Sequence, residues 1–281
     1  MVTREEKNKK IQQEISREKS IERSKKALKV IILLGFFLTA IYLNLHFIET
    51  KFIKTYEYRF KNSSIPNSFD GLKILHFSDL LYGSSINSKD LVKLQKEFNK
   101  IKPDIVVFTG DIVMPNYTLE KDELNDLKTF FKEIPYNITK YAVRGENDNS
   151  TFDLIMNEAN FKVLDNKEDL VYYMENNPIS FVGFNSNDIK EVQTKDNIFK
   201  ICLIHNYDYF KASDCPLVLA GHNLNGEIYI PFYKGILGNN KYNGKFYEEN
   251  NQTIYISNGL GTLHNMRLFN HPSINVYRLS K

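Results

Sequence analysis

The chain of 281 residues lacks the features that would mark a disulfide-stabilised, redox-active or nucleic-acid-binding protein. It has only two cysteines, Cys202 and Cys215, which cannot build a disulfide framework and do not form a C-x-x-C pair. We therefore expect both to be small core or strand residues rather than a bridge. The formal net charge is only +3, so the composition gives no indication of nucleic-acid binding. No internal repeat is visible.

One long apolar run lies near the N-terminus, from Val30 to Ile48. Its length is close to the ~20 residues that an α-helix needs to cross the hydrocarbon core of a bilayer. A secretory signal peptide would have a shorter apolar run and a small-residue cleavage site, and the sequence shows no clear site of that kind. A buried core helix is the alternative. A helix that is apolar on all faces and follows a charged tail favours an anchor, so we expect residues 29–49 to form one transmembrane helix.

Basic residues are concentrated before this run. They are Arg4, Lys7, Lys9, Lys10, Arg17, Lys19, Arg23, Lys25, Lys26 and Lys29, whereas only Lys51 and Lys54 follow it closely. Because the more basic flank stays in the cytoplasm, residues 1–28 are expected to be a basic cytoplasmic tail. Residues 50–281 then form an extracytoplasmic domain of a single-pass protein of the cell membrane.

The sequence after Thr50 alternates short buried strands with amphipathic helices. Strands are expected at "LKILHF" (72–77) and "DIVVFTG" (104–110), with a helix between them that has Ser88 as its N-cap. Further helices are expected at 121–133 and from about Thr151, and the chain after Phe161 is rich in strands, which include "LVYYME" (170–175) and "GEIYIP" (226–231). Strand–helix–strand units indicate parallel pairing, and the second half indicates another sheet. The expected fold class is α/β: a β-sandwich with helices on its outer faces.

Polar residues follow five of the expected strands. They are Asp79 after "HFS", Asp111 after "FTG", the segment "END" (146–148), His205 after "LI" and His222 after "LAG". Ligands normally collect beyond the carboxyl ends of the strands in α/β sheets. Carboxylates and imidazoles gathered there are the ligands of a divalent-metal site. Each residue alone also fits a structural role in a turn, but the ordered set favours a metal centre.

This ordered set resembles the calcineurin-like metallophosphoesterases, specifically their bacterial membrane-anchored branch. The family pattern is D-x-H, G-D, G-N-H-D, a lone H and G-H-x-H, and the resemblance includes the closing "SNGLGTLHNMRLFNHPSINVYRL". It covers essentially the whole of residues 50–281. It implies a metallophosphoesterase-like β-sandwich flanked by helices and a two-metal site that hydrolyses phosphate esters.

The chain departs from the family pattern at four positions. Leu81 and Leu224 replace two metal-binding histidines, Glu146 replaces the metal-binding asparagine, and Asn147 replaces the catalytic histidine, whereas Asp148 is retained. No catalytic residue is therefore carried over from the family motif.

The resemblance assigns metal ligands residue by residue. The first metal would take Asp79, Asp111 and the positions of Leu81 and Leu224, and leucine offers no lone pair. The second would take Asp111, Glu146, His205 and His222, which remain chemically plausible ligands. We therefore expect at most one divalent metal (Mn, Zn, Mg or Fe), with Asp79, Asp111, Glu146, His205 and His222 as candidate ligands.

Two functional interpretations remain open. The first is a pseudoenzyme that binds a phosphate-bearing ligand or an envelope partner and has little phosphoesterase activity. The second is a one-metal phosphoesterase that acts on phosphodiesters or phospholipid headgroups at the membrane surface. Arg267 is a candidate phosphate contact or a buried structural group. His76, His264 and His271 could compensate for lost ligands, although a loop or surface role is expected for them. No Ser-His-Asp or Cys-His nucleophile set is visible.

Overall fold

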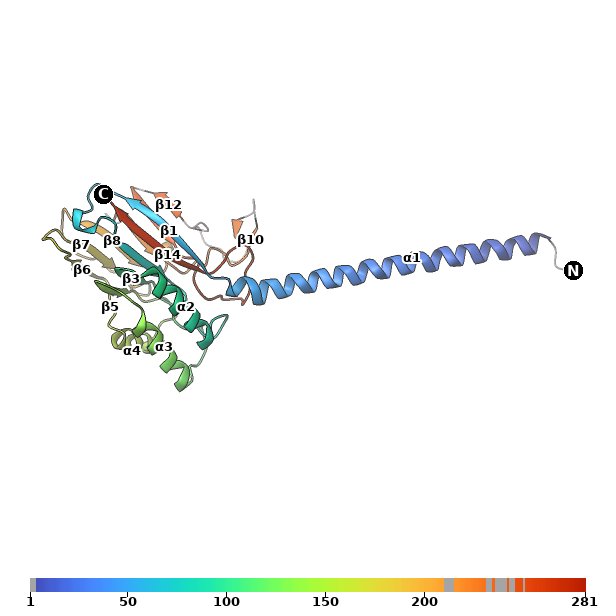
Figure 1. The fold of residues 1–281 in the computed structure, drawn as a ribbon, viewed down its shortest axis with the longest axis horizontal. Helices are drawn as coiled ribbons and strands as arrows, with labels where there is room; N and C mark the ends of the chain where they lie inside the picture. The colour runs from blue at the N-terminus through green and yellow to red at the C-terminus, as the bar shows by residue number, and fades with distance from the viewer. Residues whose placement is uncertain (1–3, 210–214, 231–233, 236–241, 243–245, 250) are drawn as a thin grey trace. The chain divides into compact units, whose positions relative to one another are not determined.

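The computed structural model of the chain describes residues 4–209, 215–230, 234–235, 242, 246–249 and 251–281 (Figure 1). The chain divides into two compact units, one ending at Leu45 and the other running from His46 to Lys281. Each unit is described by itself.

The first unit is a single helix, α1 (Arg4–Leu43). The helical segment that includes it is long and apolar enough to cross a membrane, as an anchor or as a signal sequence, and its apolar window is not buried by protein. The second unit begins with two short helical turns, η1 (Asn44–Ile48, of which residues 46–48 belong to this unit) and η2 (Glu49–Lys51).

The second unit is built on two six-stranded sheets. The first has the order β1-β14-β2-β3-β4-β5, with β1 (Lys54–Lys61), β14 (Ser273–Ser280), β2 (Lys73–Phe77), β3 (Ile105–Phe108), β4 (Thr139–Ala142) and β5 (Lys162–Val163). Strands β2 to β5 run parallel to one another, and β14 is antiparallel to β2. The parallel strands bring their carboxyl ends to one edge of the sheet.

The second sheet has the order β12-β13-β9-β8-β7-β6. Its strands are β12 (Phe246–Glu249), β13 (Gln252–Ile256), β9 (Leu217–Ala220), β8 (Phe199–Ile204), β7 (Ile179–Gly183) and β6 (Lys167–Val171). The four central strands are parallel, and the two edge strands are antiparallel to their neighbours. A separate small pair joins β10 (Tyr229–Ile230) to β11 (Lys234–Gly235).

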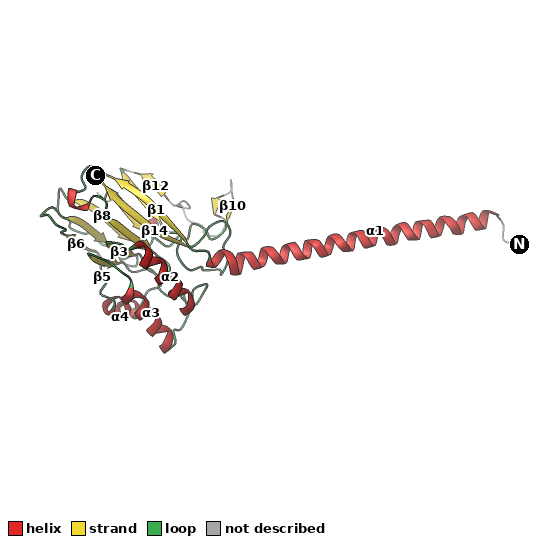
Figure 2. Cartoon of the chain, in the orientation of Figure 1, coloured by secondary structure: helices red, strands yellow, loops and turns green. Residues whose placement is uncertain are grey.

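Side-chain alternation along the strands divides the interior into layers. In β3, Ile105 and Val107 face the second sheet, whereas Val106 and Phe108 face the helices α2 (Ser88–Ile101), α3 (Lys121–Glu133) and α4 (Ser150–Glu158). Figure 2 shows these three helices gathered on one side of the strands. A β-sandwich with helices outside, as the sequence predicts, is confirmed.

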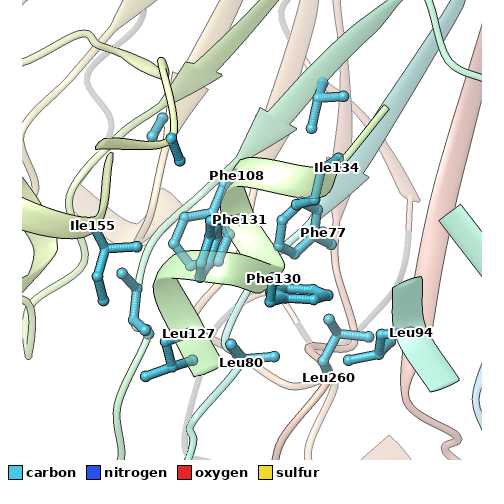
Figure 3. Packing of buried hydrophobic residues seen from close by; sticks show 14 of the residues in the cluster. Phe77, Leu80, Leu94, Phe108, Leu127, Phe130, Phe131, Ile134, Ile155 and Leu260 are labelled. Carbon is cyan, nitrogen blue, oxygen red and sulfur yellow. The ribbon is translucent and has the colours of Figure 1, made fainter. Parts of the chain in front are cut away.

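The helix-facing layer is dense in aromatic rings, as Figure 3 shows. The Phe77 ring centroid lies 4.9 Å from that of Phe108 and 6.0 Å from that of Phe131 on α3. Leu80 and Leu260, which lie in loops beyond the strand ends, belong to the same cluster (Figure 3). The packed core therefore extends up to the loops that follow the strands and fixes their position.

Local details differ from the sequence-based expectations. The N-cap of α2 is Asn87, whose side chain accepts from the Lys89 N–H, so Ser88 is already helical. The strand expected at 170–175 lies earlier, at β6, and the edge strands β1 and β12 were not predicted. Of the strand expected at 226–231, β10 covers two residues, and Pro231 lies outside the described residues. The helix expected at 121–133 matches α3.

The expectation that the cysteines are unbridged is wrong, because Cys202 and Cys215 form a disulfide. Cys202 lies on β8 and Cys215 directly precedes the neighbouring strand β9, and their Cα atoms are 5.7 Å apart, within the usual range. Both belong to the cluster on the outer face of the second sheet. Parallel pairing of β8 with β9 creates this proximity, and the sequence separation of 13 residues does not reveal it.

We predict that reduction of this disulfide lowers the free energy of unfolding by about 2–4 kcal/mol, because the bridge restricts the unfolded chain. Denaturant unfolding of the full-length chain in detergent, with and without reductant, measures the effect. A Cys202→Ser/Cys215→Ser variant should have the same free energy of unfolding as the reduced protein, and reductant should not change that value. Complete alkylation of both cysteines in unreduced, denatured protein would contradict the bridge.

Candidate metal centre

Three side chains from strand ends meet between the two sheets. Asp79 follows β2, Asp111 follows β3, and His205 follows β8 of the second sheet. Their ligand atoms all lie within 4.8 Å of one another, and all three residues are buried. This is the arrangement expected where the carboxyl ends of parallel strands from both sheets adjoin.

Glycines allow the strand-end loops to approach this closely. Gly110 has a φ of 89°, and a Cβ on it would lie 2.3 Å from the backbone nitrogen of Gly145. A Cβ on Gly221 would lie 1.9 Å from Ser78 Oγ. Side chains at these two positions would therefore push apart the loops that carry the candidate ligands.

His205 is held with one ring nitrogen toward the carboxylates. Its Nδ1 lies 2.6 Å from the Thr109 carbonyl oxygen, to which only a protonated Nδ1 can donate. Nε2 lies 3.3 Å from Asp111 Oδ2 and 3.9 Å from Asp79 Oδ1. Burial alone would lower the pKa of His205, but the carboxylates of Asp111 and Asp79 outweigh it and raise this pKa. A carbonyl that fixes the other ring nitrogen is typical of metal-binding histidines.

Asn147 and Asp148 organise the turn around Asp111. The Asn147 backbone N–H donates to Asp111 Oδ1 at 3.0 Å, and its Nδ2 donates to Oδ2 at 2.7 Å. Asp148 accepts from the backbone N–H groups of Asp111, Ile112 and Gly145 at 2.8, 3.0 and 2.8 Å. Burial, followed by the charge of Asp111, raises the pKa of Asp148 to about 6. Asp148 therefore joins two loops, and Asn147 shares the Asp111 oxygen that faces His205.

Glu146, in the loop after β4, and His222, in the loop after β9, extend the cluster. His222 Nδ1 lies 3.6 Å from Glu146 Oε2 and 3.3 Å from His205 Nε2. The His222 backbone N–H donates to Asp79 Oδ2 at 3.0 Å. The structure thus brings together all five residues that the sequence predicts as candidate ligands, and His222 and Glu146 are its more exposed members.

The two leucines at former ligand positions are buried beside the carboxylates. Leu81 and Leu224 are 1% and 3% exposed, with left-handed φ angles of 44° and 46°. Leu224 and Asp79 both pack against Gly259, since a Cβ there would meet Leu224 Cδ2 at 2.3 Å and Asp79 Cβ at 3.0 Å. Apolar side chains therefore occupy these two positions, whereas Asp79, Asp111 and His205 form a group whose donor atoms could hold a divalent metal.

Two supporting residues were missed in the sequence. The Thr109 carbonyl orients His205, and Asn206 Nδ2 donates to Glu146 Oε1 at 2.8 Å. Asn206 is buried and directly follows His205. Their adjacency to motif residues is the only signal in the sequence, because a backbone carbonyl has no sequence signature and Asn206 acts across 60 positions of chain.

Arg267, the candidate phosphate contact, is completely buried. Its terminal nitrogens donate to the carbonyl oxygens of Asn270 at 3.0 Å, Asn258 at 2.7 Å and Gly261 at 2.6 Å. Burial lowers its pKa to about 10. This geometry favours the structural alternative, since the guanidinium ties the 258–270 loop together.

The three histidines considered as substitutes have other partners. His76 is buried, with Nε2 2.9 Å from Thr109 Oγ1 and Nδ1 3.3 Å from the Tyr277 hydroxyl. His264 is exposed and contacts Glu227 through Nδ1 at 2.5 Å. His271 Nδ1 lies 2.9 Å from Glu49 Oε2. None of them belongs to the metal-ligand group found among the described residues.

The fold and this strand-end cluster define the class of protein. Residues 72–257 match the calcineurin-like phosphoesterase family, and the chain belongs to that family. It is 28% identical over 252 residues to the uncharacterized metallophosphoesterase YkuE of Bacillus subtilis (strain 168), covering 83% of this chain and 87% of the relative. It is 26% identical over 244 residues to the uncharacterized metallophosphoesterase Cj0846 of Campylobacter jejuni, covering 82% of this chain and 62% of the relative. An uncharacterized metallophosphoesterase of Aquifex aeolicus is 25% identical over 210 residues, which cover 66% of this chain and 75% of that protein.

We predict that His76 makes the protein less stable in mild acid. Burial lowers the pKa of His76 to about 3, whereas an unfolded histidine titrates near 6.5. The unfolded chain therefore binds the extra proton between these values, and stability falls by ~1.4 kcal/mol per pH unit below pH 6.5. In a His76→Gln variant, which keeps a neutral hydrogen-bonding group, the unfolding free energy should fall less steeply between pH 6.5 and 4.5. Parallel slopes for the two proteins would contradict this assignment.

Proposed function

We propose that the chain is a membrane-anchored member of the calcineurin-like phosphoesterase family that holds at most one divalent metal. Its role is the binding of a phosphate-bearing ligand or an envelope partner, and its phosphoesterase activity is low. The observation that carries this proposal is that Leu81 and Leu224 are buried and that Leu224 packs with Asp79 around Gly259, where the family pattern would have a histidine ligand.

The remaining position has a coherent donor set. Asp111, Glu146, His205 and His222 would hold the metal, with Asp79 as the nearest further carboxylate. A divalent metal there would supply Lewis-acid polarisation of a phosphoryl oxygen. Thr109 and Asn206 would keep His205 and Glu146 in place for it. Oxygen and imidazole donors do not distinguish between Mn, Zn, Mg and Fe, so the donor set leaves the identity of the metal open.

Low activity follows from what Asn147 can do. An amide cannot give and take a proton near neutral pH, and general acid–base catalysis is typically worth ~10²–10⁴-fold. In addition, the Asn147 amide already donates to Asp111 Oδ2, the oxygen closest to His205. The residue at the family's catalytic position thus stabilises a carboxylate instead of moving a proton.

A one-metal phosphoesterase is the second candidate. It is favoured by the four candidate donors Asp111, Glu146, His205 and His222, and by a neighbouring cavity of about 340 Å³ that Asn147 and Asp148 help to line. Tyr117 and Phe152 line the same cavity, so it could hold the alcohol part of a phosphodiester or a phospholipid headgroup.

Membrane anchorage with the second unit outside the cytoplasm is part of the proposal. The apolar part of α1 and the basic residues before it support residues 29–49 as a single-pass anchor after a cytoplasmic tail of residues 1–28. The disulfide between Cys202 and Cys215 supports an oxidising location for residues 50–281, because such bridges are rare in the cytosol.

We predict that the full-length chain in detergent, loaded with Mn²⁺ or Zn²⁺ and desalted, retains no more than one metal per chain. His205→Ala and His222→Ala should abolish any retained metal because each removes an imidazole from the proposed donor set. His264→Ala is the matched control, since His264 is exposed and lies outside the cluster. Elemental analysis with protein quantification gives the stoichiometry. Two metals per wild-type chain would refute the assignment of Leu81 and Leu224.

Turnover of a chromogenic phosphodiester with Mn²⁺ separates the two candidate functions. A low-activity binding protein predicts equal rates for the wild type and the His205→Ala/His222→Ala variant. A wild-type rate well above that of the variant would favour the one-metal phosphoesterase.

We further predict that Leu81→His/Leu224→His adds a second metal. Both residues have left-handed backbones, a conformation in which histidine is enriched several-fold over most residues. The double variant should retain one metal more than the wild type in the same assay. Leu81→Gln/Leu224→Gln controls for added polarity, and an unchanged stoichiometry in a folded histidine variant would show that the turns have lost ligand geometry.

A further inference from the structure

We propose that residues 46–52 and 263–269 form a second membrane-contacting surface, which rests on the lipid interface. The surface, called here the juxtamembrane patch, consists of Phe47, Ile48, Phe52, Leu263 and Phe269. The inference rests on the anchor part of the proposed function, and it adds that the folded unit itself touches the bilayer.

The patch exposes large apolar side chains. Phe47 is 61% and Phe269 is 62% exposed, and Ile48, Phe52 and Leu263 are exposed as well. Of the four exposed phenylalanines in the described part of residues 46–281, three lie here, and the fourth is Phe246. Large apolar groups gathered in this way mark an interaction surface, whereas apolar side chains scattered singly do not.

Polar and aromatic contacts hold the two segments together although more than 200 residues separate them. His46 Nδ1 lies 2.6 Å from the Asn265 carbonyl oxygen, and Glu49 Oε2 lies 2.9 Å from His271 Nδ1. The Phe52 ring packs on His271 with centroids 5.0 Å apart. Figure 1 shows the red-brown segment before β14 beside the turns that precede β1. Phe269 is two residues from His271, so its Cα lies at most about 7 Å from that of the residue on which the Phe52 ring packs.

The continuity of the chain indicates that lipid is the partner of the patch. Residues 46–48 belong to the apolar run expected to cross the membrane, yet His46 is hydrogen-bonded to the 263–269 segment. If the end of that run is in the bilayer interface, Asn265 and its neighbours must be there too. The composition agrees, because phenylalanine and leucine side chains beside lysine are typical of surfaces that lie in the interface, and Lys54 Nζ lies 5.6 Å from the Phe52 ring centroid.

The patch is also rigidly connected to the candidate metal centre. Gly261 N donates to the Asp79 carbonyl at 2.7 Å, and Asn270 Nδ2 donates to the Leu224 carbonyl at 2.6 Å. Arg267 stabilises the loop between these two hydrogen bonds by donating to the carbonyl oxygens of Asn258, Gly261 and Asn270. Contact of the patch with lipid would therefore fix the distance between the metal centre and the membrane surface.

The absence of tryptophan from the sequence permits a direct test. Single variants Phe269→Trp, Phe37→Trp and Tyr172→Trp of the full-length chain would be reconstituted in phosphatidylcholine vesicles with and without brominated acyl chains. Phe37 reports on the apolar run of α1, and Tyr172 is a control of similar exposure next to β6. We expect brominated lipid to quench the emission of Phe269→Trp and Phe37→Trp but not that of Tyr172→Trp. Unchanged thermal unfolding would show that each variant is folded.

Each other outcome has a defined meaning. Quenching of Phe37→Trp without quenching of Phe269→Trp would overturn the patch and leave the anchor intact. Lack of quenching in Phe37→Trp would overturn the anchor, and with it this inference. Equal quenching of Phe269→Trp and Tyr172→Trp would indicate non-specific adsorption and overturn the patch. A Phe269→Trp emission that depends on protein density in unbrominated lipid would assign the patch to a second copy of the chain instead.

Discussion

Two carboxylates buried where the sheets meet are the constraint on which the site depends. Asp79 and Asp111 lie out of solvent, and an unpaired buried charge costs several kcal/mol. His205 between them, together with N–H groups from Asn147 and His222, supplies the compensation. Because these donors come from strands of both sheets, satisfying the carboxylates also fixes how the sheets adjoin. The same requirement holds with or without a metal, so these contacts stabilise the arrangement of the loops in both cases.

The backbone conformation at Leu81 and Leu224 is the same as at three of the candidate ligands. Asp79, Asp111 and His222 have left-handed φ angles of 50°, 60° and 68°, and so do Leu81 and Leu224, for which this conformation is unfavourable. The Leu81 N–H donates to the Asp111 carbonyl at 3.2 Å, and Asn270 holds the Leu224 carbonyl. The surrounding hydrogen bonds therefore impose the turns of a ligand site on residues that cannot be ligands. Leu81 and Leu224 thus share the left-handed backbone of the candidate ligands, although their side chains are apolar.

The sequence predicts the parts of this molecule that local pattern controls. Continuous apolar strands followed by Asp79, Asp111, His205 and His222 were sufficient to place the candidate ligands together, and the period of Leu91, Leu94 and Phe98 was sufficient to place α2. The edge strands β1 and β12 were missed, because their half-exposed residues give no buried run. The disulfide and the contacts of Asn206 depend on pairing between distant strands, which composition and spacing do not encode.

Arg267, which the family resemblance makes a candidate phosphate contact, has the hydrogen bonds of a structural residue. A guanidinium aimed at phosphate needs free donors, but here both terminal nitrogens bind carbonyl oxygens inside the loop. Burying that charge is costly, and three carbonyls from one loop offset the cost only if the loop keeps its closed form. Gly261, one of the residues whose carbonyl accepts from the arginine, also donates its N–H to the Asp79 carbonyl at 2.7 Å. The arginine therefore acts on the candidate metal centre through the loop that it closes, because that loop is hydrogen-bonded to the residue carrying one of the carboxylates.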